Sequence, residues 1–430
     1  MAQLLQGAGY LPVSDPEQAE VILVNTCGFI EPAREESYTV LSELARGKQE
    51  GQLLVAAGCL TQRYGREVIQ KVAGIDGLLG TRRWMDILQV VDKLRRNGSP
   101  RPLFHLPETR VMGEDPEGIV GAHIQGGSAY LKIADGCRRQ CAYCAIPGIK
   151  GPAVSRPRKK ILADAIDLAS RGVREINLIA QDTTDYGYDR GEKDGLASLL
   201  EELCAAVPQV SWLRILYAYP GFITDRLIDV IAEHEQVLPY IDIPLQHADP
   251  EVLRAMRRPA NMDWVYRTVD KLRARMPGLA LRTTFIVGYP GETESSFEAL
   301  LDFVKDIRFD RVGAFEFSFE PGTASEALGD PIPAEIKSER QERLMIAQQE
   351  ISLAKNQALI GNTLDVLIEG KGQVEGHGEI ISLGRSYRDA PEIDGLVIVD
   401  GSLKEGEIHP VRITGAMVYD LSGAPALDQE

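Results

Sequence analysis

The segment Cys137-Arg-Arg-Gln-Cys141-Ala-Tyr-Cys144 sets three cysteines close together in one short stretch of the chain. It directly follows residues 130–134, an apolar run that predicts a β-strand. Three thiolates from one loop can bind three irons of a [4Fe–4S] cluster, which usually takes four protein ligands, so one iron would stay open. A structural zinc site would need a fourth Cys or His nearby, and this loop has none. A zinc site and a chance grouping are the alternatives.

The chain around this segment alternates between strand-like and helical patterns. Six strand-like runs cover residues 130–134, 175–180, 212–217, 240–245, 281–287 and 312–317. Helical stretches fall between them and a long one closes the series, at residues 161–171, 196–206, 264–275, 296–306 and 333–359. Six consecutive βα units predict an α/β fold with a partial (βα)6 barrel, open or incomplete. The cysteine segment would lie at the carboxyl ends of its strands, where barrel active sites form.

A second, smaller α/β unit precedes this barrel. Its predicted elements are two buried parallel strands and two helices, at residues 21–24, 53–57, 31–46 and 64–72. Cys27 and Cys59 each follow one of these strands. Residues 1–6 have the pattern of the last turns of a helix, with no strand before it. We therefore expect a flavodoxin-like unit whose first βα unit is missing, in a chain that begins partway through that unit.

The C-terminal part of the chain has a different character. Alternating apolar residues and Gly-rich turns predict an all-β module, with strands at residues 364–368, 379–382, 396–400 and 409–414. From Ala358 to the end, five Lys and Arg stand against thirteen Asp and Glu. A stretch rich in Pro, Gly and charge predicts a linker before the barrel. The expected domains are an N-terminal α/β domain, a linker, a barrel and an all-β module, at 1–100, 101–122, 123–358 and 359–430.

Composition limits the function classes that are open. The chain has 430 residues, 44% of them hydrophobic, and a formal net charge of −16. This balance argues against nucleic acid wrapped on a broadly basic surface. The sequence opens without a basic-then-apolar signal segment and no apolar run approaches roughly 18 residues, so we expect a cytoplasmic protein that does not enter the membrane. Six cysteines make no disulfide scaffold and favour metal binding or redox chemistry.

Polar residues and glycines follow several of the predicted barrel strands. Such residues bind ligands or perform chemistry at the carboxyl ends of barrel strands, and glycine lets the backbone approach a ligand closely. A turn without a ligand uses the same residues, and a lone histidine is as often a satisfied core residue. We predict cofactor binding by Gln181, Asp182, Gln246, His247, Gly288, Gly291 and Glu292, with Tyr217, Tyr219, Ser318 and Glu320 at equivalent strand ends.

The spacing Cys-x-x-x-Cys-x-aromatic-Cys resembles the motif of the radical S-adenosylmethionine (SAM) enzymes. This resemblance implies that Cys137, Cys141 and Cys144 are catalytic and hold a [4Fe–4S] cluster, whose open iron binds the amino and carboxylate groups of SAM. An electron from the cluster then cleaves SAM to a 5′-deoxyadenosyl radical, which abstracts a hydrogen atom. Tyr143 occupies the aromatic position and is expected near the adenine, with core packing as the alternative.

Two N-terminal segments, Asn25-Thr-Cys-Gly-Phe-Ile30 and Gly58-Cys-Leu-Thr-Gln-Arg63, resemble motifs of the methylthiotransferases, a branch of the radical SAM enzymes. In that family three N-terminal cysteines hold a second [4Fe–4S] cluster, linked to the sulfur that is inserted. Cys27 and Cys59 match two of these ligands, and the Gly-Cys-Pro-Lys-Asn-like loop that carries the third is absent from this chain. A misassigned start or a truncated form would explain the omission. Two small buried cysteines are the plainer interpretation.

The resemblance covers nearly the whole chain, as an N-terminal methylthiotransferase domain, a radical SAM core and a C-terminal TRAM module, and it favours the RimO type. Pro244-Leu-Gln-His-Ala248 and residues 384–395 resemble segments of these enzymes, which methylthiolate the β-carbon of an aspartate in the twelfth protein of the small ribosomal subunit. An acidic TRAM module would repel a phosphate backbone and attract a basic ribosomal protein. One SAM would supply the methyl group and another the radical, with a low-potential electron donor such as a flavodoxin or ferredoxin.

Three alternatives stay open on the sequence. The first is a tRNA-adenosine methylthiotransferase of the same family. The second, from another class, is a non-catalytic ribosome- or RNA-binding module with a structural metal site. The third is a truncated chain that cleaves SAM without transferring sulfur.

Overall fold

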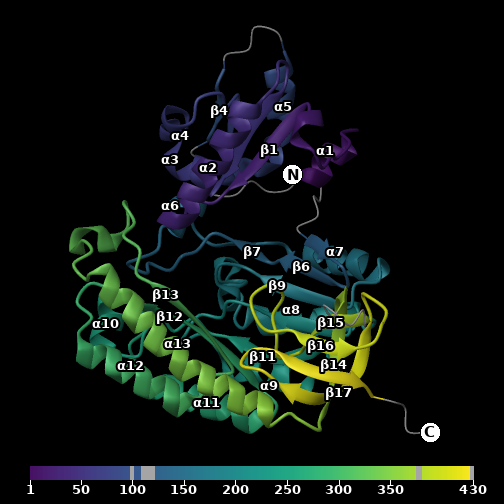
Figure 1. Cartoon of the computed structure of the whole chain (residues 1–430), viewed down its shortest axis with the longest axis vertical. Coiled ribbons are helices and arrows are strands. Elements are labelled where there is room, and N and C mark those ends of the chain that lie inside the picture. Colours follow the sequence, from purple (N-terminus) through teal and green to yellow (C-terminus); the bar gives the residue numbers. More distant parts are fainter. Residues whose placement is uncertain (97–100, 108–121, 374–379, 427–430) are drawn as a thin grey trace. The chain divides into compact units, whose positions relative to one another are not determined.

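The computed structural model describes residues 1–96, 101–107, 122–373 and 380–426. They form two compact units, of which the first contains the described residues up to 107 together with Asp135–Val154 and Ser318–Gly329 (Figure 1). The second unit contains the other described residues. The cysteine segment at 137–144 therefore belongs to the same unit as the N-terminal sheet. The expected domain boundaries at 100, 122 and 358 stay predictions.

The first unit is built on a parallel sheet in the order β1-β2-β3-β4. Its strands are β1 (Val21–Thr26), β2 (Leu53–Gly58), β3 (Gly77–Gly80) and β4 (Leu103–His105). The first two confirm the strands predicted at 21–24 and 53–57. The other two were not predicted, and β4 lies within the stretch expected to be a linker, whose residues 108–121 fall outside the described part of the chain.

Helices cover both faces of this sheet. Alternate residues of β2 point to opposite faces, so Leu54 packs against α2 and α4 whereas Val55 packs against α5. The helices are α1 (Ala2–Gly7), α2 (Glu31–Gly47), α3 (Cys59–Tyr64), α4 (Arg66–Lys71), α5 (Ile87–Arg95) and α6 (Ile146–Lys150), with short 3₁₀ turns η1 (Pro16–Gln18), η2 (Thr81–Asp86) and η5 (Ala324–Leu328). β7 (Ala134–Asp135) and β8 (Val154–Ser155) pair where the cysteine-bearing segment begins and ends.

The second unit contains an open sheet in the order β13-β12-β11-β10-β9-β6-β5. All six predicted barrel strands form and run parallel, and an unpredicted strand, β5, adds an antiparallel edge. The strands are β5 (Ala122–Gln125), β6 (Ser128–Lys132), β9 (Glu175–Ile179), β10 (Trp212–Ile215), β11 (Val237–Asp242), β12 (Ala280–Val287) and β13 (Arg311–Glu316). This is the partial (βα)6 arrangement expected from the sequence.

Helices pack on one face of the open sheet and form the largest core of the protein. In β9, Ile176 and Leu178 point into this core, whereas Glu175 and Asn177 point to the opposite face. The helices are α7 (Arg158–Ser170), α8 (Gly195–Ala206), α9 (Asp225–Glu233), α10 (Pro250–Ala255), α11 (Met262–Arg275), α12 (Glu294–Ile307) and α13 (Ala334–Gln357), with 3₁₀ turns η3 (Thr183–Asp185) and η4 (Tyr188–Arg190). Within the described ranges, no helix is long and apolar enough to span a bilayer.

The C-terminal module is a closed barrel with the strand order β14-β15-β16-β18-β17. Its core is aliphatic and includes Val366, Val399 and Ile413. The strands are β14 (Thr363–Gln373), β15 (Ile380–Ser386), β16 (Val397–Asp400), β17 (Ile408–Ala416) and β18 (Leu421–Pro425). Four of them confirm predicted strands, although residue 379, the expected start of one, lies outside the described residues. β18 was not predicted.

Buried ion pairs join this small barrel to the amino ends of the large sheet. Glu175, the first residue of β9, bonds the guanidinium groups of Arg214 at 2.8 Å and Arg385 at 2.5 Å. All three side chains are almost completely buried. Burial alone would raise the pKa of Glu175, but the two arginine charges outweigh it and lower the pKa to about 2. The carboxylate therefore stays ionised, and the small barrel is fixed at the end of the sheet remote from the strands' carboxyl ends.

We expect Glu175→Gln to lower the free energy of unfolding by about 3–5 kcal/mol, because it leaves buried arginine charge without its partner. Since the pKa of Glu175 is depressed to about 2, its contribution is complete above the ordinary pKa and is lost as the pH falls toward 2. Urea unfolding at pH 7 measures the change. The control is Glu201→Gln, whose pair with Arg226 is half exposed and should contribute at most about 1 kcal/mol. Equal losses in the two variants would contradict the assignment.

Candidate active site

The cysteine segment forms a compact loop that closes on itself. The N–H of Cys137 donates to the carbonyl of Gly151 at 3.1 Å, and the N–H of Cys144 donates to the carbonyl of Cys141 at 3.1 Å. The N–H of Arg139 donates to Cys137 Sγ at 3.4 Å. Backbone donors of this kind stabilise the negative charge of sulfur ligands. The three cysteines are half-buried, and so is Tyr143 between them; its place beside an adenine stays a prediction.

Cys27 and Cys59 lie at the carboxyl ends of neighbouring parallel strands in the same unit. Cys27 follows β1 and is exposed, whereas Cys59 is the first residue of α3 and is half-buried. Their backbones are in close contact, because a Cβ on Gly28 would lie 2.5 Å from the Cα of Leu60. Burial raises the pKa of the Cys59 thiol, while the nearby charge of Lys150 acts to lower it. The sequence prediction that these two cysteines occupy equivalent positions is thus consistent with the fold.

Arg63 fixes the loop that carries Cys27. Its guanidinium donates to the carbonyl of Gly28 at 2.9 Å and pairs with Glu320 at 2.8 Å. Glu320 also accepts the N–H of Glu31, at the start of α2, at 2.8 Å. Sequence reasoning grouped Glu320 with the barrel strand ends, but its carboxylate bonds Arg63 and the N–H of Glu31 and so stabilises the Cys27 loop. Sequence reasoning missed the role of Arg63, although the residue lies within the quoted motif.

Among the strand-end residues of the second unit, Glu292 turns back into its own loop. Its Oε2 accepts the N–H of Gly288 at 2.7 Å and that of Tyr289 at 3.2 Å, while Oε1 pairs with Arg340 at 3.1 Å. Gly288 has φ 72°, a conformation that favours glycine. Burial raises the pKa of Glu292, against the opposing effect of Arg340. The geometry gives Glu292 the role of shaping the loop, and its predicted cofactor contact is untested.

His247 is completely buried beside this loop. Its Nδ1 accepts the N–H of Asp249 at 2.9 Å, so the proton of the neutral ring lies on Nε2, 3.8 Å from Glu292 Oε2. Burial lowers the pKa of His247 to about 4. The neutral ring is therefore the form present at pH 7.

Two glutamines present buried oxygen atoms at the predicted strand ends. Gln246 has φ 77°, unusual for a residue other than glycine, and hydrogen bonds of its backbone to Thr284 and Ile286 hold it there at 2.8 Å each. Its Oε1 atom, like Oε1 of Gln181, is buried without a hydrogen-bond partner in the described part of the chain. Such atoms cost free energy unless a ligand or water satisfies them. They fit a polar ligand such as SAM at this strand end.

The remaining predicted residues have local roles. Asp182 is buried and accepts the hydroxyl of Thr184 at 2.6 Å. Gly291 has φ 92° and open space around its Cα, as expected in a tight turn. These features neither exclude nor require a ligand, so cofactor binding by Asp182 and Gly291 stays a prediction.

The donor set of the cysteine segment fits an iron–sulfur cluster. Over the described residues, no three His, Cys, Asp or Glu side chains converge as the ligands of a single metal ion would. Thiolates of a [4Fe–4S] cluster bind different irons and need not converge on one point. The five cysteines predicted as ligands all belong to the first unit, whereas Gln181, Asp182, Gln246, His247, Gly288, Gly291 and Glu292 belong to the second.

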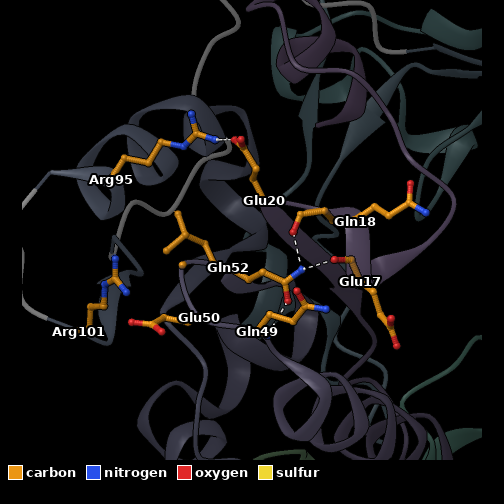
Figure 2. Close-up of a pocket in the computed structure, with 11 residues that line it drawn as sticks. Glu17, Gln18, Glu20, Gln49, Glu50, Gln52, Arg95 and Arg101 are labelled. Atoms are coloured by element: carbon orange, nitrogen blue, oxygen red, sulfur yellow. Dashed lines mark hydrogen bonds and ion pairs between the residues drawn. The ribbon is translucent and has the colours of Figure 1, made fainter.

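A polar depression lies at the other end of the N-terminal strands (Figure 2). It has a volume of about 450 Å³ and is lined by residues that precede β1 and β2, including Glu17, Glu20 and Gln52. The amide of Gln52 already donates to the carbonyls of Pro16, Glu17 and Ala19. The depression is thus separate from Cys27 and Cys59, which follow the carboxyl ends of the same strands.

Comparison with known proteins gives consistent matches along the chain. Three family models match, described as the Radical SAM superfamily over residues 131–304, Uncharacterized protein family UPF0004 over 1–80 and TRAM domain over 360–425. The ribosomal protein uS12 methylthiotransferase RimO of Roseiflexus sp. (strain RS-1) is 45% identical over 449 residues, which cover 100% of this chain and 94% of the relative. The protein of the same name from Chloroflexus aurantiacus is 47% identical over 434 residues, covering 98% and 95%.

A solved structure supports the fold. The radical SAM methyltransferase TsrM from Kitasatospora setae, determined with cobalamin and a [4Fe–4S] cluster bound, aligns with a TM-score of 0.54 at 16% identity. The alignment covers 71% of this chain and 63% of that protein. At this level of identity the likeness concerns the fold alone.

We expect the NMR-measured pKa of His247 to be about 4, against about 6.5 for an unperturbed imidazole. Because the pKa of His247 is lower in the folded than in the unfolded chain, protonation favours the unfolded chain. The free energy of unfolding is therefore unaffected by this group above about pH 6.5 and decreases as the pH falls from 6.5 to 4. At pH 5 this loss amounts to about 2 kcal/mol relative to pH 7. Urea unfolding at both pH values should therefore show a smaller pH dependence for His247→Gln than for the unmutated chain. Titration of His247 near pH 6.5 would contradict the assignment.

Proposed function

The chain belongs to the family of ribosomal protein uS12 methylthiotransferases of the RimO type, and we propose that Cys137, Cys141 and Cys144 are its cluster ligands. It is a sulfur-group transferase that uses SAM and a [4Fe–4S] cluster, with uS12 as substrate. The observation that carries this function is full-length identity of 45% and 47% to relatives of that name. The finer proposal is methylthiolation of the β-carbon of an aspartate in uS12.

The residues divide the work between the two units. When bound, the cluster and SAM supply the electron, the hydrogen-abstracting group and the methyl group. Cys137, Cys141 and Cys144 would bind three irons and leave the fourth open to SAM. The buried amide oxygens of Gln181 and Gln246 would accept hydrogen bonds from SAM, with Tyr143 near its adenine. The remaining predicted residues would shape the strand ends of the second unit around the bound SAM: Asp182, His247, Gly288, Gly291 and Glu292.

Cys27 and Cys59 are proposed as ligands of the second cluster. Both cysteines lie at the carboxyl ends of the neighbouring strands β1 and β2, where the two chain segments are in backbone contact. The third ligand of the family's motif is not among the cysteines of this sequence. Arg63 would hold the Cys27 loop in place through the carbonyl of Gly28.

The partners follow from the reaction and from charge. A ribosomal protein that binds RNA is basic, and the C-terminal barrel carries the acidic excess that would attract it. The same excess disfavours tRNA, the substrate of the alternative enzymes of this family. An external low-potential donor, a flavodoxin or ferredoxin, would supply electrons. Reaction with a ribosomal protein would place the enzyme in the cytoplasm.

We expect anaerobic reconstitution to yield about four irons and four sulfides for each cluster. Cys137→Ala should bind about four fewer irons and four fewer sulfides per chain and should no longer cleave SAM. Cys204→Ala is the matched control, because Cys204 lies in α8 and burial raises the pKa of its thiol to about 11. The control should keep its iron. Full iron and full SAM cleavage in Cys137→Ala would overturn the ligand assignment.

We expect Cys27→Ala and Cys59→Ala to keep reductive SAM cleavage but to lose methylthiolation of uS12, because they leave the first cluster intact. Mass spectrometry of uS12 measures the product and 5′-deoxyadenosine measures cleavage. A tRNA pool in place of uS12 should give no modified nucleoside. Modified tRNA with unmodified uS12 would instead favour the tRNA-adenosine enzyme, and no cleavage by the unmutated chain would favour the non-catalytic module.

A further inference from the structure

The 3₁₀ turn η2 packs against the helices next to two cysteine-bearing segments of the first unit. It directly follows β3, the strand beside β2, and it begins at Thr81. It contacts α3, whose first residue is Cys59, and α6, the short helix that follows the Cys137–Cys144 loop, and these two helices also contact each other. Figure 1 shows α6 near α3, which it contacts.

Arg82 connects η2 to α6. Its Nε donates to the carbonyl of Ile149 at 2.8 Å, and its Nη2 donates to the carbonyl of Gly148 at 2.7 Å. These carbonyls belong to the last turn of α6, where a helix has no internal donors for them. The planar guanidinium satisfies two acceptors at once with a fixed geometry, and its charge suits the negative end of the helix.

Gly151 connects α6 to Cys137 through two backbone hydrogen bonds. The N–H of Gly151 donates to the carbonyl of Pro147 in α6 at 3.0 Å, and the carbonyl of Gly151 accepts the N–H of Cys137 at 3.1 Å. Beside this contact, Gly136 has φ 75°, and a Cβ there would lie 2.1 Å from the carbonyl oxygen of Pro152. The backbone is packed so tightly at this point that a shift of α6 would carry the Cys137–Cys144 loop with it as a whole, without changing the loop's internal contacts.

η2 is also fixed to α3, the helix that begins with Cys59. The Thr81 side chain lies close to the Cys59 thiol and acts to lower its pKa, against the larger opposing effect of burial. The N–H of Arg82 donates to Gln62 Oε1 at 3.4 Å, and the hydroxyl of Thr61 donates to the carbonyl of Leu79, at the end of β3, at 2.7 Å. Both partners belong to α3, the helix that starts with Cys59. Hydrogen bonds thus connect α3, the helix that begins with Cys59, through Arg82 of η2 to α6 and from there to Cys137.

We propose that Arg82 forms a bridge between α3 and α6 that sets the separation between the Cys27–Cys59 site and the Cys137–Cys144 loop, as a positioning residue for sulfur transfer. The proposal rests on the proposed function, because it assumes that the two sites must cooperate in one reaction. A misplacement of about 1 Å can reduce the rate of such a step by a factor of about 100. SAM cleavage uses the loop's own cluster and does not involve the Cys27–Cys59 site, so the bridge is expected to affect transfer and to leave cleavage unchanged.

The test compares Arg82→Met with Arg83→Met in the full chain. Arg83 occupies the next position of η2 and bonds Asp86 at 2.8 Å, which makes it a matched control for removing an arginine from this turn. Amide hydrogen exchange in the metal-free protein should be at least tenfold faster at residues 148–151 in Arg82→Met and unchanged there in Arg83→Met. Arg82→Lys, which cannot reproduce the two-pronged contact, should lie between them.

The reconstituted variants give the second measurement. Arg82→Met should keep its iron and its rate of 5′-deoxyadenosine formation, while the amount of methylthiolated uS12 per 5′-deoxyadenosine falls at least tenfold. Unchanged exchange at 148–151, or cleavage and transfer that fall in parallel, would overturn the bridge. If the unmutated chain cleaves SAM but forms no product, the proposed function fails, and the exchange measurement still decides whether Arg82 holds α6.

Discussion

The direction of its parallel strands is the constraint on which the arrangement of this protein depends. In a parallel sheet all carboxyl ends meet at one edge, so residues that follow different strands are brought together without further design. The first unit uses this to place Cys27 after β1 beside Cys59 after β2. The second unit uses it to gather Gln181, Gln246 and Gly288 after β9, β11 and β12. In both sheets, the parallel direction of the strands thus brings residues from separate parts of the chain together.

The opposite ends of the strands of the large sheet serve stability. There, Glu175, Arg214 and Arg385 are buried together, and Arg311 at the start of β13 pairs with Asp389 of the small barrel at 2.5 Å. Buried ion pairs contribute little net stability compared with apolar packing, but removing one partner is costly. Their effect is therefore to specify one way of docking the barrel. Because docking uses the amino ends, the carboxyl ends remain available for ligands.

Sequence reasoning recovered the features that are encoded locally. Buried runs such as 53–57 and the cysteine spacing are read within a few residues, and β2 and the barrel strands form where expected. It missed β3, because the strand is only Gly-Leu-Leu-Gly. It also missed β4, which lies in a stretch rich in proline and glycine and forms a strand by pairing with β3, more than twenty residues earlier in the chain. The roles within the site also depend on distant contacts. Glu320 bonds the N–H of Glu31, and nothing near either residue in the sequence points to the other.

Two arginines hold the cysteine-bearing loops in the same chemical manner. Arg63 donates to the carbonyl of Gly28 in the Cys27 loop, and Arg82 donates to those of Gly148 and Ile149 beyond the Cys144 end of the other loop. Both act on backbone oxygen atoms, so the loops' own side chains stay available as ligands. An iron–sulfur cluster with thiolate ligands carries negative charge, and its potential depends on nearby charge and hydrogen bonds. A lysine would supply the charge without the fixed two-pronged geometry, so these positions select arginine for placement and charge together.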